Sequence, residues 1–345
     1  MNVLMIGMGM VARTHVMALR DNTSGLRLGA VLGRDAARTD AFCDEAGLML
    51  GYDVAAHVSL DDALVARPDL ALVLTPPNAR LEYARSLATA GIPTLFEKPL
   101  ERTMDGARTV LTCFETAGVP MALCFQHRTR AAAQALKAQL DSGALGEVVH
   151  VEMRVPWWRD QSYYDVPGRG TFARDGGGVM INQAIHTLDL GLWLVGSVVQ
   201  VQALMRTSPL HRMEAEDIAV GLLEFACGAS GVLSASTAAY PGGAESISIT
   251  TTRAQVTLAG DDLTIAWMDG RVSTHTDGKG AATGGGADPM AFTHAWHQAV
   301  IEGFAQAVRA GTAPLATGHE ALHVHAVIGA MERAARTGTK AEVGS

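Results

Sequence analysis

A glycine pattern near the N-terminus is the feature that most limits how this chain can fold. The string Gly7-Met8-Gly9-Met10-Val11-Ala12 directly follows a short apolar run, residues 3–6, and precedes a segment of helical character, residues 11–19. A turn of this kind lets the backbone approach a pyrophosphate, whose negative charge then meets the N-terminus of the helix. The pattern predicts a dinucleotide-binding unit at the start of the chain.

Strand and helix patterns alternate through the first third of the sequence and then change. Apolar runs at 26–32, 70–74 and 92–96 are separated by helical patterns, which indicates a doubly wound parallel sheet. Later segments alternate polar and apolar residues, most clearly over 246–250, which is typical of an antiparallel sheet with one buried face. We predict an α/β Rossmann domain over residues 1–122 and an α+β domain with an open, mostly antiparallel sheet over 123–345.

Composition excludes several classes of partner. A chain of 345 residues exceeds what one core usually holds, and its net charge of −8 gives no basic footprint for nucleic acid. The N-terminus lacks the features of a signal peptide, and no apolar stretch approaches the length of a membrane span. We expect a cytoplasmic protein with no nucleic-acid or membrane partner.

Cysteine and histidine spacing gives no sign of a metal site. The four cysteines show no CxxC pair, so neither a disulfide framework nor a zinc motif is indicated. His294 and His297, like His319 and His323, are spaced so that each pair could share a helical face. Because no carboxylate or cysteine clusters beside them in the sequence, we predict solvated or capping histidines and no metal.

The end of the second predicted strand bears on the choice of dinucleotide. An acid about twenty residues beyond the glycine turn would accept hydrogen bonds from a ribose 2′-hydroxyl. Here the strand is followed by Gly33-Arg34, so a guanidinium stands where the acid is expected. Arginine suits a 2′-phosphate through charge-assisted hydrogen bonds, which favours NADP. The alternative is NAD, with Arg34 solvated and Asp35 as a displaced ribose acceptor.

A helix downstream of Gly176-Gly177-Gly178 carries a polar stripe beside an apolar one. The members of the polar stripe recur at spacings of four, three and four: Asn182, His186, Asp189 and Trp193. These spacings place them on one helical face. Since the rest of the helix is apolar, we expect this face to look into a cleft, although a lone histidine is more often a satisfied core residue.

These strings resemble the family of glucose-fructose oxidoreductase, inositol dehydrogenase and the rhizopine-catabolism protein MocA. The resemblance runs through nearly the whole chain and includes the glycine turn with His15, Thr75-Pro76-Pro77-Asn78, Glu97-Lys98-Pro99, Gly143 to Glu147 and Gly176 to Asp189. Glu-Lys-Pro after the fourth strand, with glycines and a histidine downstream, is specific to that family.

The resemblance implies a pyridine-nucleotide oxidoreductase acting mostly on sugars, polyols or their derivatives. In the family, the lysine of Glu-Lys-Pro, here Lys98, lies near the nicotinamide and the substrate hydroxyl, and its bond to Pro99 is commonly cis. The open sheet is often used for oligomerisation, so we expect a homodimer or homotetramer formed through the C-terminal sheet.

The expected chemistry uses three residues. His186 takes the hydroxyl proton as hydride leaves the same carbon, and Lys98 stabilises the developing alkoxide. Like charge from the nicotinamide, together with desolvation, should lower the basicity of Lys98. Asn182 stands where many relatives carry an aspartate, and because an amide cannot exchange protons it should only orient substrate or His186.

Two groups of contact residues complete the prediction. Those expected to contact the nucleotide are Gly7, Gly9, Met10, Val11, Gly33, Arg34, Thr75, Pro76, Asn78, Glu97 and Lys98. Those expected to bind the substrate are Arg128, Trp158, Arg169, Asn182 and Asp189. Aromatic faces suit sugar rings and arginine donates to hydroxyl or carboxylate groups, although the aromatic segment around Trp158 could equally form a core or interface cluster.

Two other functions fit the same residues. One is an NAD-dependent glycosidase, since family relatives use transient oxidation to eliminate a glycosidic bond. The other is a nucleotide-responsive regulator that has lost catalysis, against which the presence of both Lys98 and His186 argues.

Overall fold

The computed structural model describes residues 1–276, 285–286 and 290–344, which form two compact units. The first unit comprises Met1–Gln126 and His294–Ala321, and the second comprises His127–Thr293 and Leu322–Ser345. The units differ from the predicted domains chiefly in residues 294–321, which lie within the predicted second domain, 123–345, but pack into the first unit.

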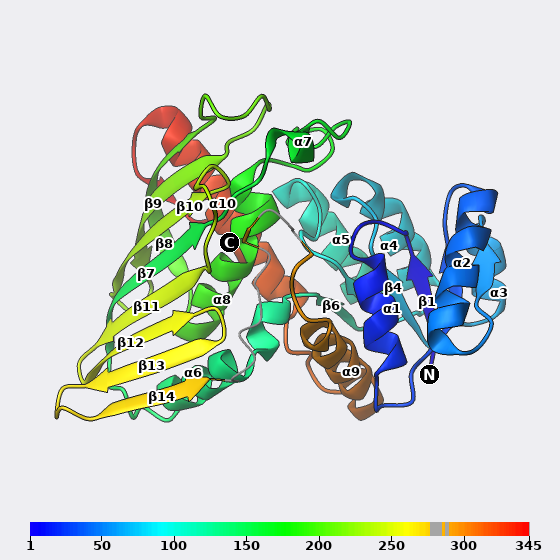
Figure 1. Cartoon of the computed structure of the whole chain (residues 1–345), viewed down its shortest axis with the longest axis horizontal. Coiled ribbons are helices and arrows are strands. Elements are labelled where there is room, and N and C mark those ends of the chain that lie inside the picture. The colour runs from blue at the N-terminus through cyan, green and yellow to red at the C-terminus, as the bar shows by residue number, and fades with distance from the viewer. Residues whose placement is uncertain (277–284, 287–289, 345) are drawn as a thin grey trace. The chain divides into compact units, whose positions relative to one another are not determined.

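The first unit is built on a six-stranded parallel sheet of order β3-β2-β1-β4-β5-β6. Figure 1 labels its strands β1, β4 and β6. Its strands are β1 (Asn2–Ile6), β2 (Arg27–Leu32), β3 (Ala55–His57), β4 (Leu70–Val73), β5 (Thr94–Phe96) and β6 (Met121–Leu123). The central strand β1 pairs with β2 on one side and β4 on the other, and its Val3, Leu4, Met5 and Ile6 are almost fully buried. Strands covered on both faces read as continuous apolar runs, which is why the sequence marks them clearly.

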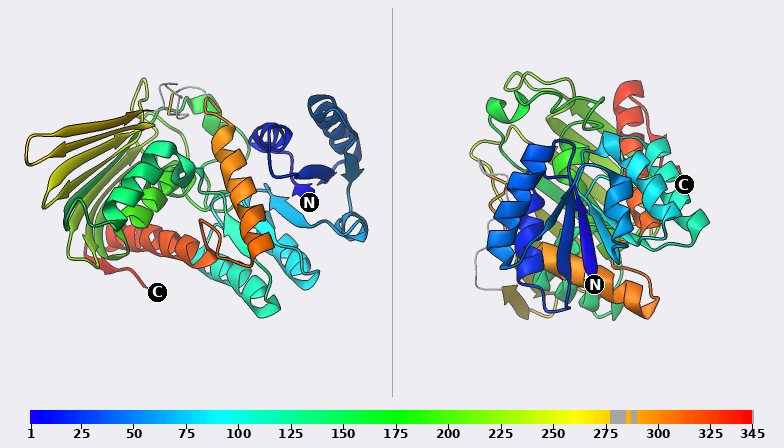
Figure 2. Two further views of the ribbon diagram at one scale, coloured as in Figure 1. Left: turned by 90° about the horizontal axis from the view of Figure 1, so that it is seen from below. Right: turned by 90° about the vertical axis from the view of Figure 1, so that its right-hand side faces the viewer.

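Helices cover both faces of this sheet, as the right-hand view of Figure 2 shows for the blue helices α1 and α2 and the cyan helices α4 and α5. The helices before residue 126 are α1 (Ala12–Arg20), α2 (Ala36–Leu50), α3 (Leu60–Val65), α4 (Arg80–Thr89) and α5 (Met104–Ala117), with a 3₁₀ turn η1 (Pro77–Ala79) before α4. The doubly wound parallel sheet is therefore confirmed.

A helix from late in the sequence completes the core of the first unit. α9 (Ala295–Ala310) packs on α1, and its Val300, Ile301 and Phe304 belong to the same buried cluster as residues of β1 and β2. Burying these side chains against the first unit removes apolar surface from water, which explains why residues 294–321 join it.

The second unit contains a nine-stranded sheet of order β14-β13-β12-β11-β7-β10-β9-β8-β15. Its strands are β7 (Val148–Pro156), β8 (Val198–Arg206), β9 (Ile218–Phe225), β10 (Ser230–Ser236), β11 (Ser246–Thr251), β12 (Ala254–Ala259), β13 (Asp262–Trp267), β14 (Val272–Thr276) and β15 (Ala341–Glu342). Neighbours pair antiparallel except β7 and β10, which run parallel. The predicted open, mostly antiparallel sheet is confirmed.

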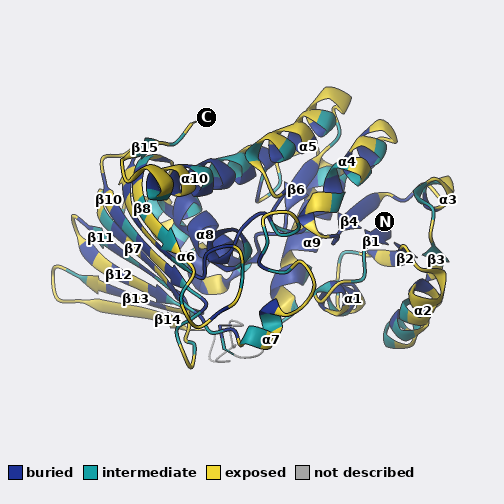
Figure 3. Cartoon of the chain, turned by 90° about the horizontal axis from the view of Figure 1, so that it is seen from above, coloured by how far each residue is buried: buried dark blue, intermediate teal, exposed yellow. Residues whose placement is uncertain are grey.

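One face of this sheet is buried and the other is exposed, and Figure 3 shows the alternation along the strands. In β9, for example, Ala219, Leu223 and Phe225 are buried, whereas Val220 and Leu222 are exposed. The remaining elements of the unit are α6 (Ala131–Asp141), α7 (Gln161–Tyr164), α8 (Ile185–Val195) and most of α10 (Gly318–Thr337), with a 3₁₀ turn η2 (Gln126–Thr129) and a π-helical turn η3 (Met180–Ala184). Across the described ranges, no helix is both long enough and apolar enough to span a bilayer.

Candidate active site

The glycine turn after β1 is closely packed against the end of β4. Gly7 has φ +100°, and a Cβ at this position would lie 3.1 Å from the Thr75 nitrogen and 3.2 Å from the Leu74 carbonyl carbon. The Gly7 amide also donates to the Leu32 carbonyl oxygen at 2.9 Å. Only glycine meets both requirements without strain, so the backbone here stays bare for a ligand.

The start of α1 suits an anion. Its N-cap residue, Val11, makes no side-chain hydrogen bond to the first turn, and Met10 just before it is half exposed. The backbone N–H groups of a helix N-terminus attract negative charge, and a bare glycine turn lets phosphate come close to them. The residues present therefore fit the pyrophosphate of a dinucleotide.

Just after β2, a positively charged side chain, Arg34, is exposed, and the acid beside it, Asp35, is bound to the protein backbone. Arg34 is exposed, and its charge acts on Tyr83 of α4. Asp35 is the N-cap of α2, and its carboxylate accepts from the Arg38 amide at 2.8 Å. Gly33 is held close to Thr39, whose hydroxyl would lie 2.2 Å from an added Cβ.

A buried arginine fastens the two loops that follow β4 and β5. Arg80, 2% exposed, donates from Nε and Nη2 to the Thr75 carbonyl at 3.0 and 2.9 Å, and from Nη1 to the carbonyls of Glu97 and Pro99. Burial lowers the pKa of Arg80 to about 10, so it keeps its charge at neutral pH. Lys98 is half-buried, and Arg80 binds the residues before and after it, so the backbone at Lys98 is fixed in position. The Lys98–Pro99 peptide bond is cis, as expected.

Glu97 lies in a buried cluster with two histidines and a cysteine. Its Oε1 is 2.8 Å from Nε2 of His15 and 3.7 Å from Nε2 of His297, and its carboxylate is hydrogen-bonded to Cys124. One ligating atom from each of the four residues lies within 4.8 Å of the others. Sequence spacing could not reveal this cluster, because its members come from α1, the ends of β5 and β6, and α9.

Three carboxyl, thiol and imidazole groups of the cluster, those of Glu97, Cys124 and His297, have pKa values displaced from the ordinary ones, each for a physical reason. Burial acts to raise the pKa of Glu97, but the His15 hydrogen bond and the surrounding charges outweigh it, so that pKa lies well below the usual range. Burial and the charge of His15 lower the pKa of His297 to about 3. Burial and the Glu97 carboxylate raise the pKa of the Cys124 thiol.

In the second unit, the backbone amides at the triple glycine before η3 bind a carboxylate of the protein itself, that of Glu216. A Cβ on Gly178 would lie 1.7 Å from the Glu216 carbonyl oxygen, which only glycine permits. The Glu216 carboxylate, 7% exposed, accepts from the amides of Gly178 at 3.1 Å and Met180 at 3.0 Å. Burial is the main cause that raises the pKa of Glu216. This carboxylate is a partner that the sequence analysis missed.

Asn182 lies in the π-helical turn η3. Its side-chain amide donates to the carbonyl oxygens of Gly177 at 2.9 Å and Gly178 at 3.0 Å. The amide is therefore bonded back into the glycine turn and fixes the start of the helix that carries His186. π-Helical turns within α-helices occur frequently at functional sites.

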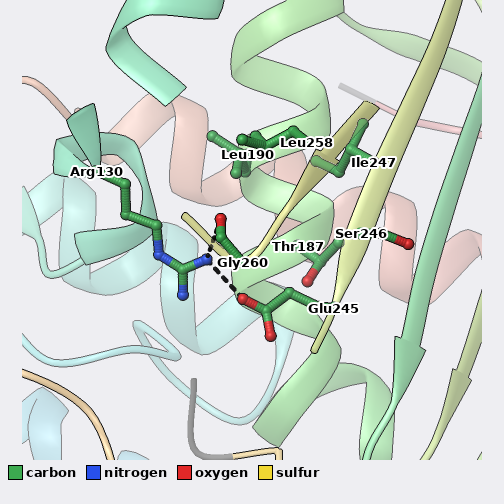
Figure 4. A pocket seen from close by; sticks show the side chains of 8 residues that line it. All are labelled: Arg130, Thr187, Leu190, Glu245, Ser246, Ile247, Leu258 and Gly260. Atoms are coloured by element: carbon green, nitrogen blue, oxygen red, sulfur yellow. Dashed lines mark hydrogen bonds and ion pairs between the residues drawn. The ribbon is translucent and has the colours of Figure 1, made fainter. Parts of the chain in front are cut away.

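His186 is buried on α8 and stacks on another histidine. Its ring lies 4.8 Å from that of His127, with 25° between the planes. His127 accepts from Arg130 Nη2 at 2.6 Å, so its Nε2 is unprotonated and the ring is neutral. Arg130 in turn donates to Glu245 at 2.6 Å, which Figure 4 shows together with its contact to the Gly260 carbonyl. The small pocket beside this pair, between α8 and the sheet, contains none of the predicted site residues; its lining is Arg130, Thr187, Leu190, Glu245, Ser246, Ile247, Leu258 and Gly260.

Two residues predicted to bind substrate bind each other. Arg128 donates from Nε to Asp189 Oδ2 at 2.9 Å and from Nη2 to Oδ1 at 2.6 Å, and both side chains are almost fully buried. A bidentate pair of this geometry is strong and directional. Its observed contact joins η2 to α8, one helical turn beyond His186.

An aromatic and cationic group forms on the segment after β7. Trp158, half-buried, packs edge-on against Tyr240 with ring centroids 5.3 Å apart. Arg169 lies over the ring of Tyr163 at 4.2 Å. The two predicted residues, Trp158 and Arg169, therefore each pack against an aromatic side chain, which covers part of their surface.

The predicted site residues thus fall into two groups. The nucleotide-contact residues and Lys98 all belong to the first unit, whereas His186, Asn182 and the substrate-contact residues belong to the second. Convergence of Lys98 and His186 over a bound coenzyme stays a prediction.

Comparison with known proteins matches both halves of the chain. Residues 1–125 match the profile described as oxidoreductase family, NAD-binding Rossmann fold, and residues 133–257 match the GFO/IDH/MocA C-terminal domain. Together the two profiles cover well over half of the chain.

Individual relatives are sugar dehydrogenases. A D-apiose dehydrogenase of Rhizobium rhizogenes is 28% identical over 237 residues, which cover 67% of this chain but only 64% of that enzyme. An NADP⁺-dependent D-xylose 1-dehydrogenase of Haloferax volcanii is 26% identical over 91% of both chains.

Among solved structures, the WlbA dehydrogenase of Bordetella pertussis in complex with NADH and UDP-GlcNAcA superposes with a TM-score of 0.82 and is 26% identical. The match covers all of this chain and 99% of that one. The glycine turn, the Glu-Lys-Pro segment and the two family profiles agree, and the chain belongs to the GFO/IDH/MocA family of oxidoreductases.

Proposed function

We propose that the protein is an NAD(P)-dependent dehydrogenase that acts on a hydroxyl carbon of a sugar, polyol or sugar derivative. The observation that carries this proposal is Lys98, which follows β5 at the same carboxyl edge of the sheet as the glycine turn after β1. Ligands of doubly wound sheets bind at that edge. Sugar dehydrogenases among the relatives support the substrate class.

Each residue has a distinct role in the proposed reaction. His186 accepts the proton of the substrate hydroxyl, and the Lys98 ammonium donates a hydrogen bond to the developing alkoxide. Asn182, bonded to the glycine turn, holds the first turn of the helix that carries His186. When bound, the nicotinamide supplies the hydride acceptor.

On the substrate side, we assign direct contact to Trp158 and Arg169, which offer a flat ring and a hydrogen-bond donor. Arg128 and Asp189 act differently in this proposal, because each is already the other's partner. Their pair fixes α8 against η2 and thereby holds His186 and His127 in place.

The test is the absorbance of the reduced nucleotide during incubation with a panel of sugars, inositols and sugar acids. Lys98→Met and His186→Asn should each lower kcat by about 10²- to 10⁴-fold while nucleotide binding persists. Lys137→Met and His150→Asn, half-buried residues of the second unit outside the proposed site, serve as matched controls.

Absence of turnover with every compound, despite nucleotide binding, would count against a dehydrogenase and favour a regulator. Release of an aglycone from glycosides without net nucleotide reduction would favour the glycosidase.

For the coenzyme, we favour NADP. Arg34 is exposed after β2, and Asp35, the alternative ribose acceptor, is engaged as the cap of α2. Arg34→Ala should lower kcat/KM for NADP by about 10- to 100-fold and leave that for NAD nearly unchanged. Arg108→Ala, on α5, is the control. An equal loss for both nucleotides would contradict the preference.

We also propose that copies of the chain associate through the exposed face of the nine-stranded sheet. Leu204 of β8 is paired in register with Val220 of β9, and Leu222 lies two residues further along that face; all three are exposed. Contiguous exposed apolar residues favour an interface. Leu222→Glu should convert a dimer or tetramer to smaller species in light scattering, whereas Glu224→Gln on the same strand should not. A monomeric unmodified protein would exclude this interface.

The described cysteines are free. This supports placing the protein in a reducing compartment, the cytoplasm.

A further inference from the structure

Against the expectation from sequence of solvated histidines and no metal, we infer that His15, Glu97, Cys124 and the buried His297 form a structural site for zinc inside the first unit. Their potential ligand atoms, two imidazole nitrogens, a carboxylate oxygen and a thiol sulfur, lie within 4.8 Å of one another. The four residues are between 0% and 7% exposed. Such a convergence of donors is unlike the scattered acidic groups of a protein surface.

The donors come from four separate elements. His15 lies on α1 and His297 on α9, while Glu97 and Cys124 directly follow β5 and β6. The amide of Cys124 donates to the Phe96 carbonyl at 2.8 Å, and the Glu97 amide donates to the Val73 carbonyl at 2.9 Å. Two donors are thus set by the sheet ladder, and two by helices that pack on each other.

The spacing agrees with tetrahedral coordination. With metal–ligand distances of about 2.0–2.3 Å, the ligand atoms of such a site stand about 3.3–3.7 Å apart. Here the Glu97 Oε1 atom lies 2.8 Å from His15 Nε2 and 3.7 Å from His297 Nε2, and no pair exceeds 4.8 Å. Shifts of about 1 Å by side-chain rotation would therefore complete the shell.

The donor set also selects the metal and balances its charge. Imidazole and thiolate are preferred by zinc, whereas calcium and magnesium prefer sites built wholly of oxygen. A Zn²⁺ ion with one carboxylate, one thiolate and two neutral imidazoles carries no net charge, which suits a fully buried position. On binding, the thiol of Cys124 loses its proton to solvent and its sulfur bonds to the metal.

Four protein ligands leave no position open for water or substrate, which is the mark of a structural site. The inference does not require the proposed dehydrogenase activity, but it removes the Glu97 side chain from the predicted nucleotide contacts, because its carboxylate would bind the metal. Such a site would tie α9 to α1 and to the ends of β5 and β6. The competing interpretation is that the four groups form a hydrogen-bonded cluster alone, centred on Glu97.

The experiment measures the metal content of the full chain produced in zinc-supplemented medium and desalted. We expect about one zinc ion per chain by mass spectrometry of the metal. After removal of zinc, titration with Co²⁺ should give the intense visible bands of tetrahedral cobalt and a near-ultraviolet band from thiolate-to-cobalt charge transfer.

Cys124→Ser should abolish the charge-transfer band, and His297→Gln should reduce the zinc content at least tenfold. The matched controls are Cys43→Ser, another buried cysteine of the same unit, and His294→Gln, one turn earlier beside α9; both should keep the site.

Unmodified protein that takes up neither zinc nor cobalt would overturn the inference, as would zinc that remains fully bound in Cys124→Ser. Should that variant fail to fold, the cobalt spectrum of the unmodified chain still decides: an octahedral spectrum without the thiolate band excludes the site. Loss of metal in the Cys43→Ser control would likewise refute it.

Discussion

Two glycine turns, each before a helix, are used in opposite ways by the two units. At Gly7 the turn lies against Leu74 and Thr75, which follow β4, and Val11, the N-cap residue of α1, makes no side-chain hydrogen bond. At Gly178 the equivalent space is filled by Glu216, whose carboxylate accepts from the amides that open η3. The first turn is left for an external anion, whereas the second holds an anion supplied by the protein.

The comparison teaches that glycines before a helix indicate an anion position but not the source of the anion. The helix N-terminus attracts negative charge in both cases. Whether a carboxylate from elsewhere in the chain occupies it depends on tertiary structure. Substitutions at the two turns should therefore separate loss of stability from loss of nucleotide binding.

The largest expected effect is at the filled turn. Gly178→Ala would place a Cβ 1.7 Å from the Glu216 carbonyl oxygen and 2.8 Å from its nitrogen, so backbone must move. We expect a loss of about 4 kcal/mol or more in the free energy of unfolding, measured by chemical denaturation. Gly303→Ala, at an exposed position of α9 with no atom near the new Cβ, should instead change stability by at most about 1 kcal/mol. Similar stability of the two variants would contradict the close approach.

The next effect should fall on ligand binding. Gly7→Ala must adopt φ near +100° and crowd Thr75, which disturbs the turn where we place the pyrophosphate. We expect affinity for NADPH or NADH to fall by about 10- to 100-fold in fluorescence titration, with a stability loss of about 1–3 kcal/mol. Gly118→Ala also has a positive φ but meets no neighbouring atom, so it should lose stability alone. Unchanged nucleotide affinity in Gly7→Ala would contradict binding of the pyrophosphate at this turn.

A smaller effect tests the charge that fills the second turn. Glu216→Gln keeps the shape of the side chain but leaves one acceptor oxygen and no negative charge at the start of η3. We expect a loss of about 1–2 kcal/mol in thermal or chemical unfolding, with nucleotide affinity unchanged. Glu224→Gln, whose partner is the exposed Lys340, should cost less than about 0.5 kcal/mol. Equal effects would show that Glu216 does not act as a cap.

The smallest effect is a pH dependence at the same turn. Glu332 Oε1 lies 3.9 Å from the position of a Cβ on Gly177, and burial of its carboxyl group, with the charge of Glu216, raises the pKa of Glu332 to about 7. The folded protein therefore binds a proton that the unfolded chain, with an ordinary pKa of 4.5, releases. Stability from this group is present below pH 4.5 and is lost as the pH rises towards 7.

Although its carboxyl group is partly desolvated, Glu332 as a whole residue is exposed, so solvent screening should keep that change below about 1 kcal/mol. Glu332→Gln should flatten the dependence of stability on pH between 4.5 and 7, and Glu216→Gln should shift it to lower pH. A slope that survives in Glu332→Gln would assign it to another group.

Much of the fold could be predicted because the strands of both sheets have characteristic local patterns of apolar residues in the sequence. Strands buried on both faces form apolar runs, and strands buried on one face alternate, as in Ser246–Thr251. Membership of α9 in the first unit could not be predicted. Its apolar stripe shows that one face is buried, but a stripe does not name the surface that covers it.

The candidate site was predictable where a motif is contiguous and not where partners are distant. The glycine turn and Glu97-Lys98-Pro99 are local strings, whereas Arg128 and Asp189 meet across 61 residues of sequence. The stack of His127 on His186 and the four residues around Glu97 arise in the same way, from packing. No spacing rule applies to side chains that four separate elements bring together.

The assignment of residues 294–321 to the first unit sets the order in which the protein can be completed. During synthesis the ribosome releases residues 1–126, then residues 127–293 of the second unit, and only afterwards the helix whose Val300, Ile301 and Phe304 close the first core. Until then that core faces water on one side. The nascent first unit therefore stays incomplete while residues 127–293 are translated. A fragment that ends at residue 126 should need chaperones to avoid aggregation.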